Sequence, residues 1–182
     1  MGKKIYFLGM KSCGKTTVGA RVAEALALPF IDLDDVLLRL AEEETGEPFA
    51  SCREAYKSLG KEAFRRLEAL AAGELASKDI PEICALGGGT VENPEARRAL
   101  EGTGFFVYLR ESPDILYRRI SSRGIPAFLD PQNPEDAFYR LFEKREKDYS
   151  ALATITLDCR GRAAAPVAEE VLTRLKEAGY GG

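Results

Sequence analysis

Residues 9–16 read Gly9-Met10-Lys11-Ser12-Cys13-Gly14-Lys15-Thr16, which fits the pattern GxxxxGK[ST]. An apolar run, residues 4–8, comes directly before this stretch, and residues 14–26 place apolar side chains at helical spacing. A strand, a glycine-rich turn and a helix in this order form the phosphate-binding loop, or P-loop, of many nucleotide-binding proteins. The stretch therefore predicts a nucleotide site at the start of an α/β fold.

Each part of this loop has a physical task. Its glycines let the backbone wrap around an anion, and the N–H groups at the start of the helix face the phosphates. The Lys15 ammonium reaches the β and γ oxygens, which makes it a catalytic residue, and the Thr16 hydroxyl ligates Mg²⁺. We predict that ATP and Mg²⁺ bind here, and that the nucleotide contacts come from Gly9, Lys11, Ser12, Cys13, Gly14, Lys15, Thr16 and Thr17.

The motif alone leaves two questions open. A glycine-rich turn between a strand and a helix can occur by chance, although the flanking pattern disfavours this. A true P-loop binds nucleotide phosphates in kinases and in NTPase switches alike, so the loop does not distinguish these two classes. The residues on the acceptor side have to distinguish them.

Five short apolar runs are separated by stretches of helical pattern, which is typical of a parallel sheet with helices on both faces. These runs span residues 4–8, 29–33, 80–86, 105–109 and 154–157. The chain has no internal repeat, low-complexity tract or linker. We therefore predict an α/β fold in which residues 1–182 form a single domain.

The composition excludes several classes of partner. A net charge of −3 gives no attraction to nucleic acid or to an anionic membrane. No stretch approaches the roughly 20 apolar residues of a membrane span, and residues 1–10 lack a leader cleavage site. Four widely spaced cysteines without any histidine disfavour a zinc site, namely Cys13, Cys52, Cys84 and Cys159. We expect a reduced, cytoplasmic monomer whose partner is a small molecule.

Acidic residues follow the second apolar run, in the segment Ile31-Asp32-Leu33-Asp34-Asp35. The carboxyl ends of strands are where open α/β sheets bind ligands. In an extended segment Asp32 and Asp34 point to the same side, so that Asp32 can support the hydrated Mg²⁺ while Asp34 accepts a hydrogen bond from a substrate hydroxyl. The alternative is structural, because Asp34 or Asp35 can cap a helix that runs through Leu40.

Two further features suit an anionic acceptor. Arg65 and Glu68 lie three residues apart on one predicted helix, residues 65–75, where they can pair. A guanidinium held in this way is a preorganised fork for a carboxylate, although exposed pairs of this kind are also common on surfaces. The run Gly87-Gly88-Gly89 ends the third strand and allows a ligand to approach the backbone, where a plain flexible turn would need fewer glycines.

Together, these motifs resemble the shikimate kinase family in their order and approximate spacing. The resemblance covers residues 4 to about 171 and rests on the P-loop, Asp32-x-Asp34, Phe64-Arg65-x-x-Glu68, Gly87-Gly88-Gly89 and Lys144-Arg145 four residues before Tyr149. It implies a three-layer P-loop kinase fold whose five-stranded parallel sheet has the order 2-3-1-4-5. It also implies a helical acceptor-binding region at about 34–77 and a lid at about 121–134.

The resemblance further implies the reaction and the roles of the site residues. ATP, with Mg²⁺, would phosphorylate a hydroxyl of shikimate, and Asp34 would be the base that contacts the acceptor hydroxyls. Arg65 and Arg145 would clamp the acceptor carboxylate beside the backbone of residues 87–89. The adenine would lie beside a group of arginines, namely Arg118 or Arg119, and Arg162.

Two departures from the family pattern bear on the acceptor. The segment between Asp34 and Arg65 is several residues longer than usual, and Ile125 stands where the family has an arginine before Pro126 of the lid. We expect Arg123 to supply this catalytic cation, or else to end the preceding helix, where it would interact with the helix dipole. The alternatives to shikimate phosphorylation are a related kinase for gluconate or another hydroxy acid, and a binding protein without catalysis.

Overall fold

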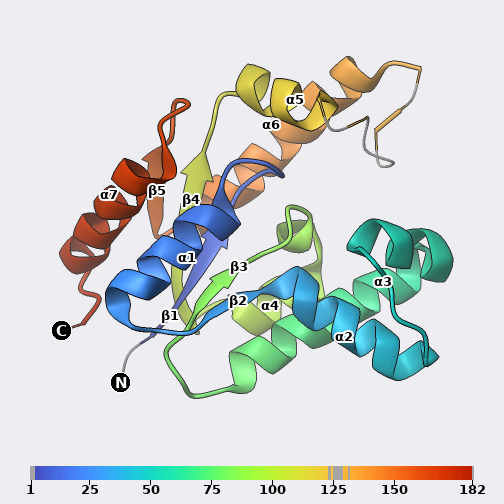
Figure 1. Cartoon of the computed structure of the whole chain (residues 1–182), viewed down its shortest axis with the longest axis horizontal. Coiled ribbons are helices and arrows are strands. Elements are labelled where there is room, and N and C mark those ends of the chain that lie inside the picture. Colours follow the sequence, from blue (N-terminus) through green and yellow to red (C-terminus); the bar gives the residue numbers. More distant parts are fainter. Residues whose placement is uncertain (1–2, 123, 125–128, 131, 182) are drawn as a thin grey trace.

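The computed structural model describes residues 3–122, 124, 129–130 and 132–181. Its strands are β1 (Lys4–Leu8), β2 (Phe30–Asp32), β3 (Ile83–Ala85), β4 (Gly104–Arg110) and β5 (Ile155–Asp158). They form one five-stranded parallel sheet in the order β2-β3-β1-β4-β5, which confirms the predicted topology (Figure 1). In the centre of the sheet, Ile5 pairs with Ile83 on one side and with Phe105 on the other.

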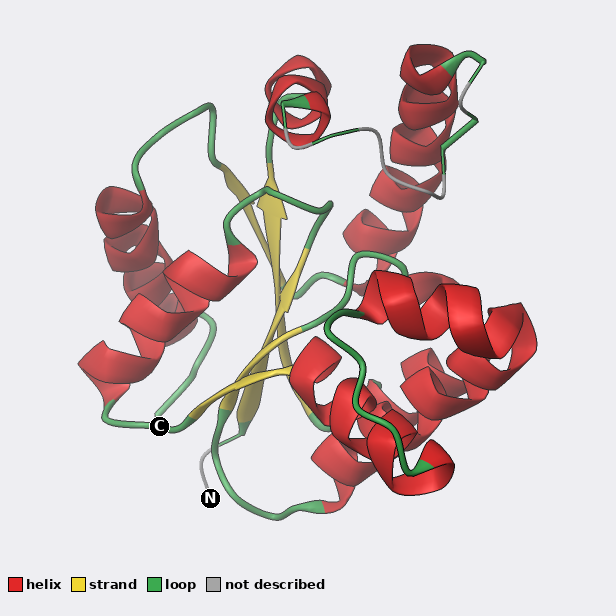
Figure 2. Ribbon diagram, turned by 45° about the vertical axis from the view of Figure 1, so that its right-hand side comes forward, coloured by secondary structure: helices red, strands yellow, loops and turns green. Residues whose placement is uncertain are grey.

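Helices cover both faces of this sheet, as the alternating sequence pattern predicts. They are α1 (Lys15–Leu26), α2 (Leu33–Thr45), α3 (Cys52–Ser77), α4 (Pro94–Leu100), α5 (Pro113–Ser121), α6 (Pro134–Leu152) and α7 (Ala164–Glu177). Figure 2 shows α1 and α7 on one face of the sheet, with α3, α4 and α6 on the other. A short 3₁₀ turn, Thr90–Glu92, joins β3 to α4. The three-layer arrangement expected from the sequence is thereby confirmed.

Burial on both faces explains why the central strands read as continuous apolar runs. Residues 5–8 of β1 are each at most 1% exposed. β3 is shorter than the apolar run at 80–86, because Pro81 has no N–H to donate to a neighbouring strand. The next residue, Glu82, is buried at the amino end of the sheet, where its Oε1 pairs with the Lys4 ammonium at 2.7 Å while its Oε2 has no hydrogen-bond partner among the described residues.

α3 begins within the longer segment noted between Asp34 and Arg65. Its first part begins at Cys52 and stops at Gly60, whose φ of 81° and ψ of 171° are not helical. The Ser51 hydroxyl accepts a hydrogen bond from the N–H of Glu54 at 3.3 Å, and the Glu54 carboxylate accepts one from the N–H of Ala50 at 2.9 Å. This pattern of serine followed by glutamate three residues later is a sequence signal for the start of a helix.

The parallel strands bring three loops to the same edge of the sheet. The P-loop follows β1, α2 begins directly after β2, and the glycine run 87–89 follows β3 (Figure 1). Since these three strands are neighbours in the sheet, the segments that follow them lie side by side. The residues predicted from separate parts of the sequence therefore meet at this carboxyl edge.

Candidate active site

The backbone of the P-loop explains its glycines. Gly9 has a φ of 140°, and a Cβ placed on it would lie 2.7 Å from Cys13 Sγ and 2.8 Å from the Leu109 carbonyl oxygen. Gly14, the N-cap of α1, has a φ of 106°, which side chains of L-residues rarely adopt. Ser12 between them also lies in the left-handed region, at a φ of 67°. Both glycines of the motif are thus required by the loop itself.

Lys15 and Thr16, at the start of α1, place their polar atoms along this loop. The Lys15 ammonium donates to the carbonyl oxygens of Gly9 at 2.8 Å and Met10 at 3.1 Å. The Thr16 hydroxyl donates to Asp32 Oδ2 at 3.0 Å. An ammonium and two hard oxygen ligands therefore lie together at the N-terminus of a helix, where an anion is favoured.

The remaining predicted nucleotide contacts differ in exposure. Cys13 is 4% exposed and packs its thiol near Gly9, so its backbone is the part available to a ligand. Lys11 and Thr17 are exposed, and Ser12 is half-buried. This pattern agrees with a loop that would contact phosphates mainly through its main chain.

The acidic segment after β2 differs from its predicted geometry. β2 ends at Asp32 and α2 begins at Leu33, so that Asp34 lies in a helix. The prediction that Asp32 and Asp34 share one side of an extended segment is therefore wrong, and so is capping by Asp34 or Asp35. Asp32 itself is the N-cap, because its Oδ1 accepts a hydrogen bond from the Asp34 N–H at 3.1 Å. Its other oxygen remains directed at Thr16.

Asp34 lies beside the glycine run that follows β3. A Cβ placed on Gly87 would be 3.2 Å from Asp34 Oδ1. Solvent reaches the Asp34 side chain, yet the protein around the carboxylate removes enough water to raise its pKa, and the Asp32 carboxylate raises this pKa further, whereas Lys15 lowers it. A carboxylate with a raised pKa is a stronger base, which suits it to accept a proton from a hydroxyl.

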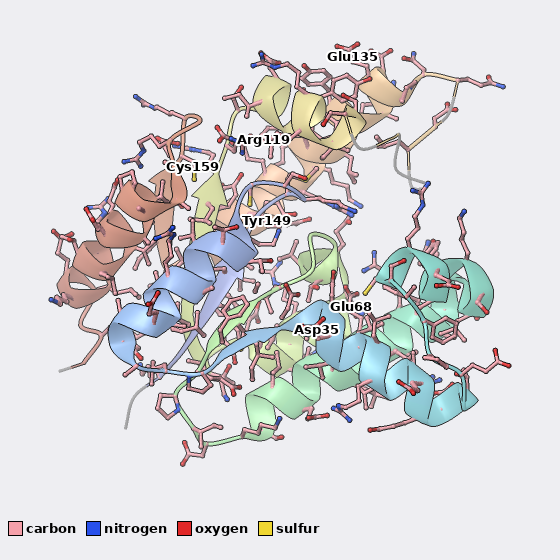
Figure 3. All side chains as sticks on the ribbon, viewed as in Figure 1. Asp35, Glu68, Arg119, Glu135, Tyr149 and Cys159 are labelled. Carbon is pink, nitrogen blue, oxygen red and sulfur yellow. The ribbon has the colours of Figure 1, made fainter. Side chains whose placement is uncertain are left out.

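Arg65 on α3 is held from two sides. Its Nη1 lies 2.6 Å from Glu68 Oε2 and donates to the Gly89 carbonyl oxygen at 3.0 Å. Glu68, labelled in Figure 3, is 4% exposed and also accepts hydrogen bonds from Thr90 at 3.0 Å and Asn93 at 3.1 Å. Burial and these bonds immobilise the guanidinium, so the pair differs from an exposed surface ion pair.

Arg145 on α6 is held by a different acid. Its Nε donates to Glu92 Oε2 at 2.8 Å, and the Lys144 ammonium lies 2.8 Å from the other oxygen of Glu92. Burial acts to raise the pKa of Glu92, but the two cations outweigh it and hold this pKa below its usual range. Tyr149, one turn further along α6 (Figure 3), is fully buried and donates to the Gly88 carbonyl oxygen, which ties the helix to the glycine run.

The glycine run, residues 87–89, has no side chains, so the groups around it come close to its backbone. A Cβ placed on Gly89 would lie 3.1 Å from Arg145 Nη2 and 3.5 Å from Arg65 Nη1. A Cβ on the preceding glycine would lie 3.5 Å from the backbone nitrogen of Lys11 in the P-loop. Both arginines and the phosphate-binding loop therefore reach the same short piece of backbone.

The structure separates the three arginines predicted to lie beside the adenine. Arg119 Nη1 donates to the Ser12 carbonyl oxygen of the P-loop at 3.2 Å, whereas Arg118 is exposed and donates to a carbonyl of its own helix. Arg162 lies in the turn after β5 and donates to the Asp158 carbonyl oxygen at 2.8 Å. Of the two residues left open by the sequence, Arg119 is the one in contact with the P-loop.

Six residues of the lid predicted at about 121–134 lie outside the described residues, namely 123, 125–128 and 131. Arg123, the predicted lid cation, and Ile125 are both outside them, so this prediction stays untested. At the start of the segment, the N–H of Gly124 donates to the Ser121 carbonyl oxygen at 3.0 Å, and Gly124 has a φ of 89°. The backbone is thus in the left-handed region at Gly124, beyond the end of α5 at Ser121.

Comparison with known proteins agrees with this geometry. A family model described as shikimate kinase matches residues 11–176. The chain belongs to the shikimate kinase family. A curated shikimate kinase of Thermus thermophilus is 39% identical over 168 residues, which cover 92% of this chain and 86% of that protein. The shikimate kinase of Symbiobacterium thermophilum is 33% identical over 180 residues, 98% of this chain and 99% of that protein.

Solved structures of the shikimate kinase family resemble this chain over nearly its whole length. The shikimate kinase from Acinetobacter baumannii in complex with shikimate has a TM-score of 0.84 at 28% identity, covering 98% of this chain and 96% of that one. A gluconokinase from Sinorhizobium meliloti 1021 has a TM-score of 0.61 at 23% identity, covering 97% of this chain and 93% of that one. The second likeness shows a shared fold alone.

Within this shikimate kinase family member, sequence reasoning missed the residues that hold the two arginines. Glu92 pairs with Arg145, while Thr90 and Asn93 bind the acid that pairs with Arg65. All three polar residues follow the glycine run within four positions. The sequence did contain a signal, namely three polar side chains directly after the glycine run, but it could not show which distant residues these side chains bind.

The groups next to the P-loop suit a magnesium ion. Thr16 Oγ and an oxygen of Asp32 are hard donors 3.0 Å apart. Mg²⁺ is usually held by one or two such protein ligands together with substrate phosphates. Over the described ranges, no three or more acidic, cysteine or histidine side chains gather into a metal-binding group. This donor set therefore fits a Mg²⁺ ion that shares its coordination with ATP.

Proposed function

We propose that this chain transfers the γ-phosphoryl group of ATP to a hydroxyl of shikimate, which forms shikimate 3-phosphate for the synthesis of chorismate and the aromatic amino acids. The convergence of Arg65 and Arg145 on Gly89, beside the P-loop, is the observation that carries the proposal. Two immobilised guanidiniums above a bare backbone suit a carboxylate on a small ring. Family membership and the Acinetobacter baumannii complex support the same acceptor.

Transfer requires three tasks from this chain. Asp34 accepts the proton of the acceptor hydroxyl while the oxygen of that hydroxyl forms a bond to the γ-phosphorus. The bond from the γ-phosphorus to the bridging oxygen of ADP breaks at the same time. Lys15 and the P-loop amides stabilise the charge on the phosphoryl oxygens. Arg65 and Arg145 hold the acceptor by its carboxylate, which converts the reaction into one between positioned groups. Thr16 and Asp32 would hold Mg²⁺, which when bound would neutralise further phosphate charge.

The alternatives have weaker support. A gluconate kinase would share the P-loop and the fold, yet its acceptor is an open chain. The two fixed arginines and the glycine run favour a compact ring instead. A binding protein without catalysis would have no need of Lys15, Thr16 and Asp34 together, and this chain retains all three. Arg123 stays our proposed lid cation, with Gly124 giving the backbone freedom beside it.

An assay of ADP release tests the proposal. Purified protein with Mg·ATP would be given shikimate, quinate, gluconate or a nucleoside monophosphate in separate reactions. We expect turnover with shikimate well above the rate with any other acceptor. Turnover with gluconate alone would establish the related kinase instead, and ATP binding without turnover on any acceptor would establish the binding protein.

Replacing Arg65 with Ala should raise the KM for shikimate on the order of 30-fold, because a charge-assisted bond to the carboxylate is lost. The KM for ATP should change little. Arg66→Ala is the matched control, since Arg66 is the next residue but is half-exposed and pairs with Glu44 on the surface. Steady-state kinetics with each substrate varied in turn make the measurement. Equal rises in both KM values would contradict the carboxylate clamp.

We also propose that the protein works as a cytoplasmic monomer whose partners are small molecules. The net charge of −3 supports the exclusion of nucleic acid. In the part of the chain that the structure describes, no helix combines the length and the apolar character that a membrane crossing needs.

A further inference from the structure

Glu111, the first residue after β4, is a buried acid to which the proposed function gives no role. It is 3% exposed. Acidic side chains are rarely buried to this extent unless other groups compensate the charge, because removing a carboxylate from water is costly. Its partners therefore indicate what the burial achieves.

The Glu111 carboxylate binds three separate segments. The N–H of Ser112, at the start of α5, donates to Oε1 at 2.9 Å. The N–H of Gly161, in the turn between β5 and α7, donates to both oxygens at 3.0 Å. Nη1 of Arg119, near the end of α5, lies 3.4 Å from Oε2. One side chain thus links the beginning of a helix, its end and a distant turn.

The turn bound by Glu111 has an unusual backbone. Arg160 and Gly161 have φ values of 48° and 71°, so two consecutive residues are in the left-handed region. A non-glycine residue in this region carries strain, which surrounding contacts must offset. The two bonds from the Gly161 N–H to Glu111 are contacts of this kind. The carboxylate therefore holds the turn in a shape that it would not readily keep alone.

The same carboxylate reaches the P-loop through one intermediate. Arg119 Nη1, which faces Glu111, also donates to the Ser12 carbonyl oxygen at 3.2 Å. Figure 3 shows Arg119 on α5 beside the P-loop. Since this guanidinium is fixed from both sides, its remaining N–H donors and its flat face keep a defined position next to the loop.

The position of the nucleotide base follows from the proposed function, on which this inference rests. The P-loop holds the phosphates, and the side toward α3 and α6 is taken by the acceptor groups Asp34, Arg65 and Arg145. The base must therefore extend to the other side, toward the ends of β4 and β5. Arg119 and the turn that contains Arg162 are the two segments that border this space.

We propose that Glu111 is a positioning residue that holds both walls of the base site, Arg119 and the turn after β5, and thereby sets the affinity for ATP. It does not touch the nucleotide. Its effect should fall on the base end, because the phosphates would be bound by the N–H groups of the P-loop and by Lys15, whereas Arg119 contacts this loop at the Ser12 carbonyl oxygen.

Replacing Glu111 with Gln tests this role with little change of volume. The amide has one acceptor oxygen, carries no charge for Arg119 and turns an N–H₂ group toward backbone donors. We expect the KM and the Kd for Mg·ATP to rise about tenfold, because Arg119 and the turn after β5 would no longer be fixed where the base contacts them, an effect about as large as the loss of one bond to a charged group. The kcat and the KM for shikimate should stay within about twofold. Affinity for Mg·tripolyphosphate, which has no base, should be unchanged.

A matched control separates positioning from general stability. Glu82 is also a buried acid, paired with Lys4 at 2.7 Å at the opposite end of the sheet. Glu82→Gln should lower the Tm without changing the KM for ATP. If Glu111→Gln leaves ATP affinity unchanged, raises both KM values equally, or weakens tripolyphosphate as much as ATP, the proposal is wrong.

Calorimetric titration keeps this inference separate from the proposed function. Binding of Mg·ATP to the wild-type protein and to Glu111→Gln needs no acceptor. Wild-type binding with no turnover of shikimate would reject the proposed function and leave the role of Glu111 intact. Turnover of shikimate together with equal ATP affinity in both proteins would support the proposed function and reject the role of Glu111.

Discussion

Lys15→Ala is expected to lower kcat by roughly 10³-fold while the protein remains folded. The ammonium of Lys15 lies along the P-loop carbonyls, where it would meet the β and γ oxygens of ATP. Charge that develops on the transferred phosphoryl group would lose its nearest cation, so the loss should fall mainly on kcat. The fold should survive, because Lys15 is half-buried at the start of α1 and is not part of the core.

This expectation is measured by steady-state ADP release at saturating shikimate, with circular dichroism and Tm as the check on folding. Lys176→Ala is the control, since Lys176 is an exposed lysine near the end of α7. A kcat close to that of the wild type in Lys15→Ala would mean that these residues are not a catalytic P-loop.

Asp34→Asn should reduce kcat to a similar degree, on the order of 10³-fold, because the amide cannot accept the hydroxyl proton. The KM for ATP should be nearly unchanged. Asp35→Asn is the matched control, since Asp35 is the next residue on α2 and is also exposed (Figure 3). Full activity of Asp34→Asn would remove Asp34 from the mechanism.

The raised pKa of Asp34 gives this variant a second signature. Because its pKa is higher in the folded than in the unfolded chain, the folded state binds more protons between the two values, and stability falls as pH rises through that window. Asn carries no charge at any pH, so Asp34→Asn should keep or raise the Tm at neutral pH. In the wild type, kcat/KM should fall as pH is lowered through the raised pKa, since the base becomes protonated. A variant that is inactive because it is unfolded would show a lower Tm instead.

The sequence predicted the layout of the fold because parallel sheets leave a strong local pattern. The run at 4–8 coincides with β1, and residues buried on both faces have to be apolar. The sequence was less informative about where a strand ends at a charged residue or a proline. β3 is shorter than its apolar run, and no local rule showed that Glu82 would find Lys4 across 78 positions.

The candidate site was predictable in its residue types more than in its geometry. We predicted an extended segment in which Asp32 and Asp34 point to the same side. Instead, Asp32 caps α2, which begins at Leu33, so that Asp34 is helical. The choice between Arg118 and Arg119 depended on helix rotation relative to a loop more than 100 positions away. Glu111 was not recognised, because a single glutamate after a strand looks like a surface residue until its three partners are known.

Charge pairing inside the acceptor pocket limits how far its field extends. Arg65 shares its charge with Glu68, Arg145 and Lys144 share theirs with Glu92, and Asp34 adds a further negative group. Opposite charges this close cancel beyond a few ångströms, so little long-range attraction would draw an anion in from solution. The rate of capture would then depend weakly on ionic strength. Selectivity would arise only once the acceptor is in the pocket, where the fixed guanidiniums of Arg65 and Arg145 distinguish a carboxylate by its shape and not by its charge alone.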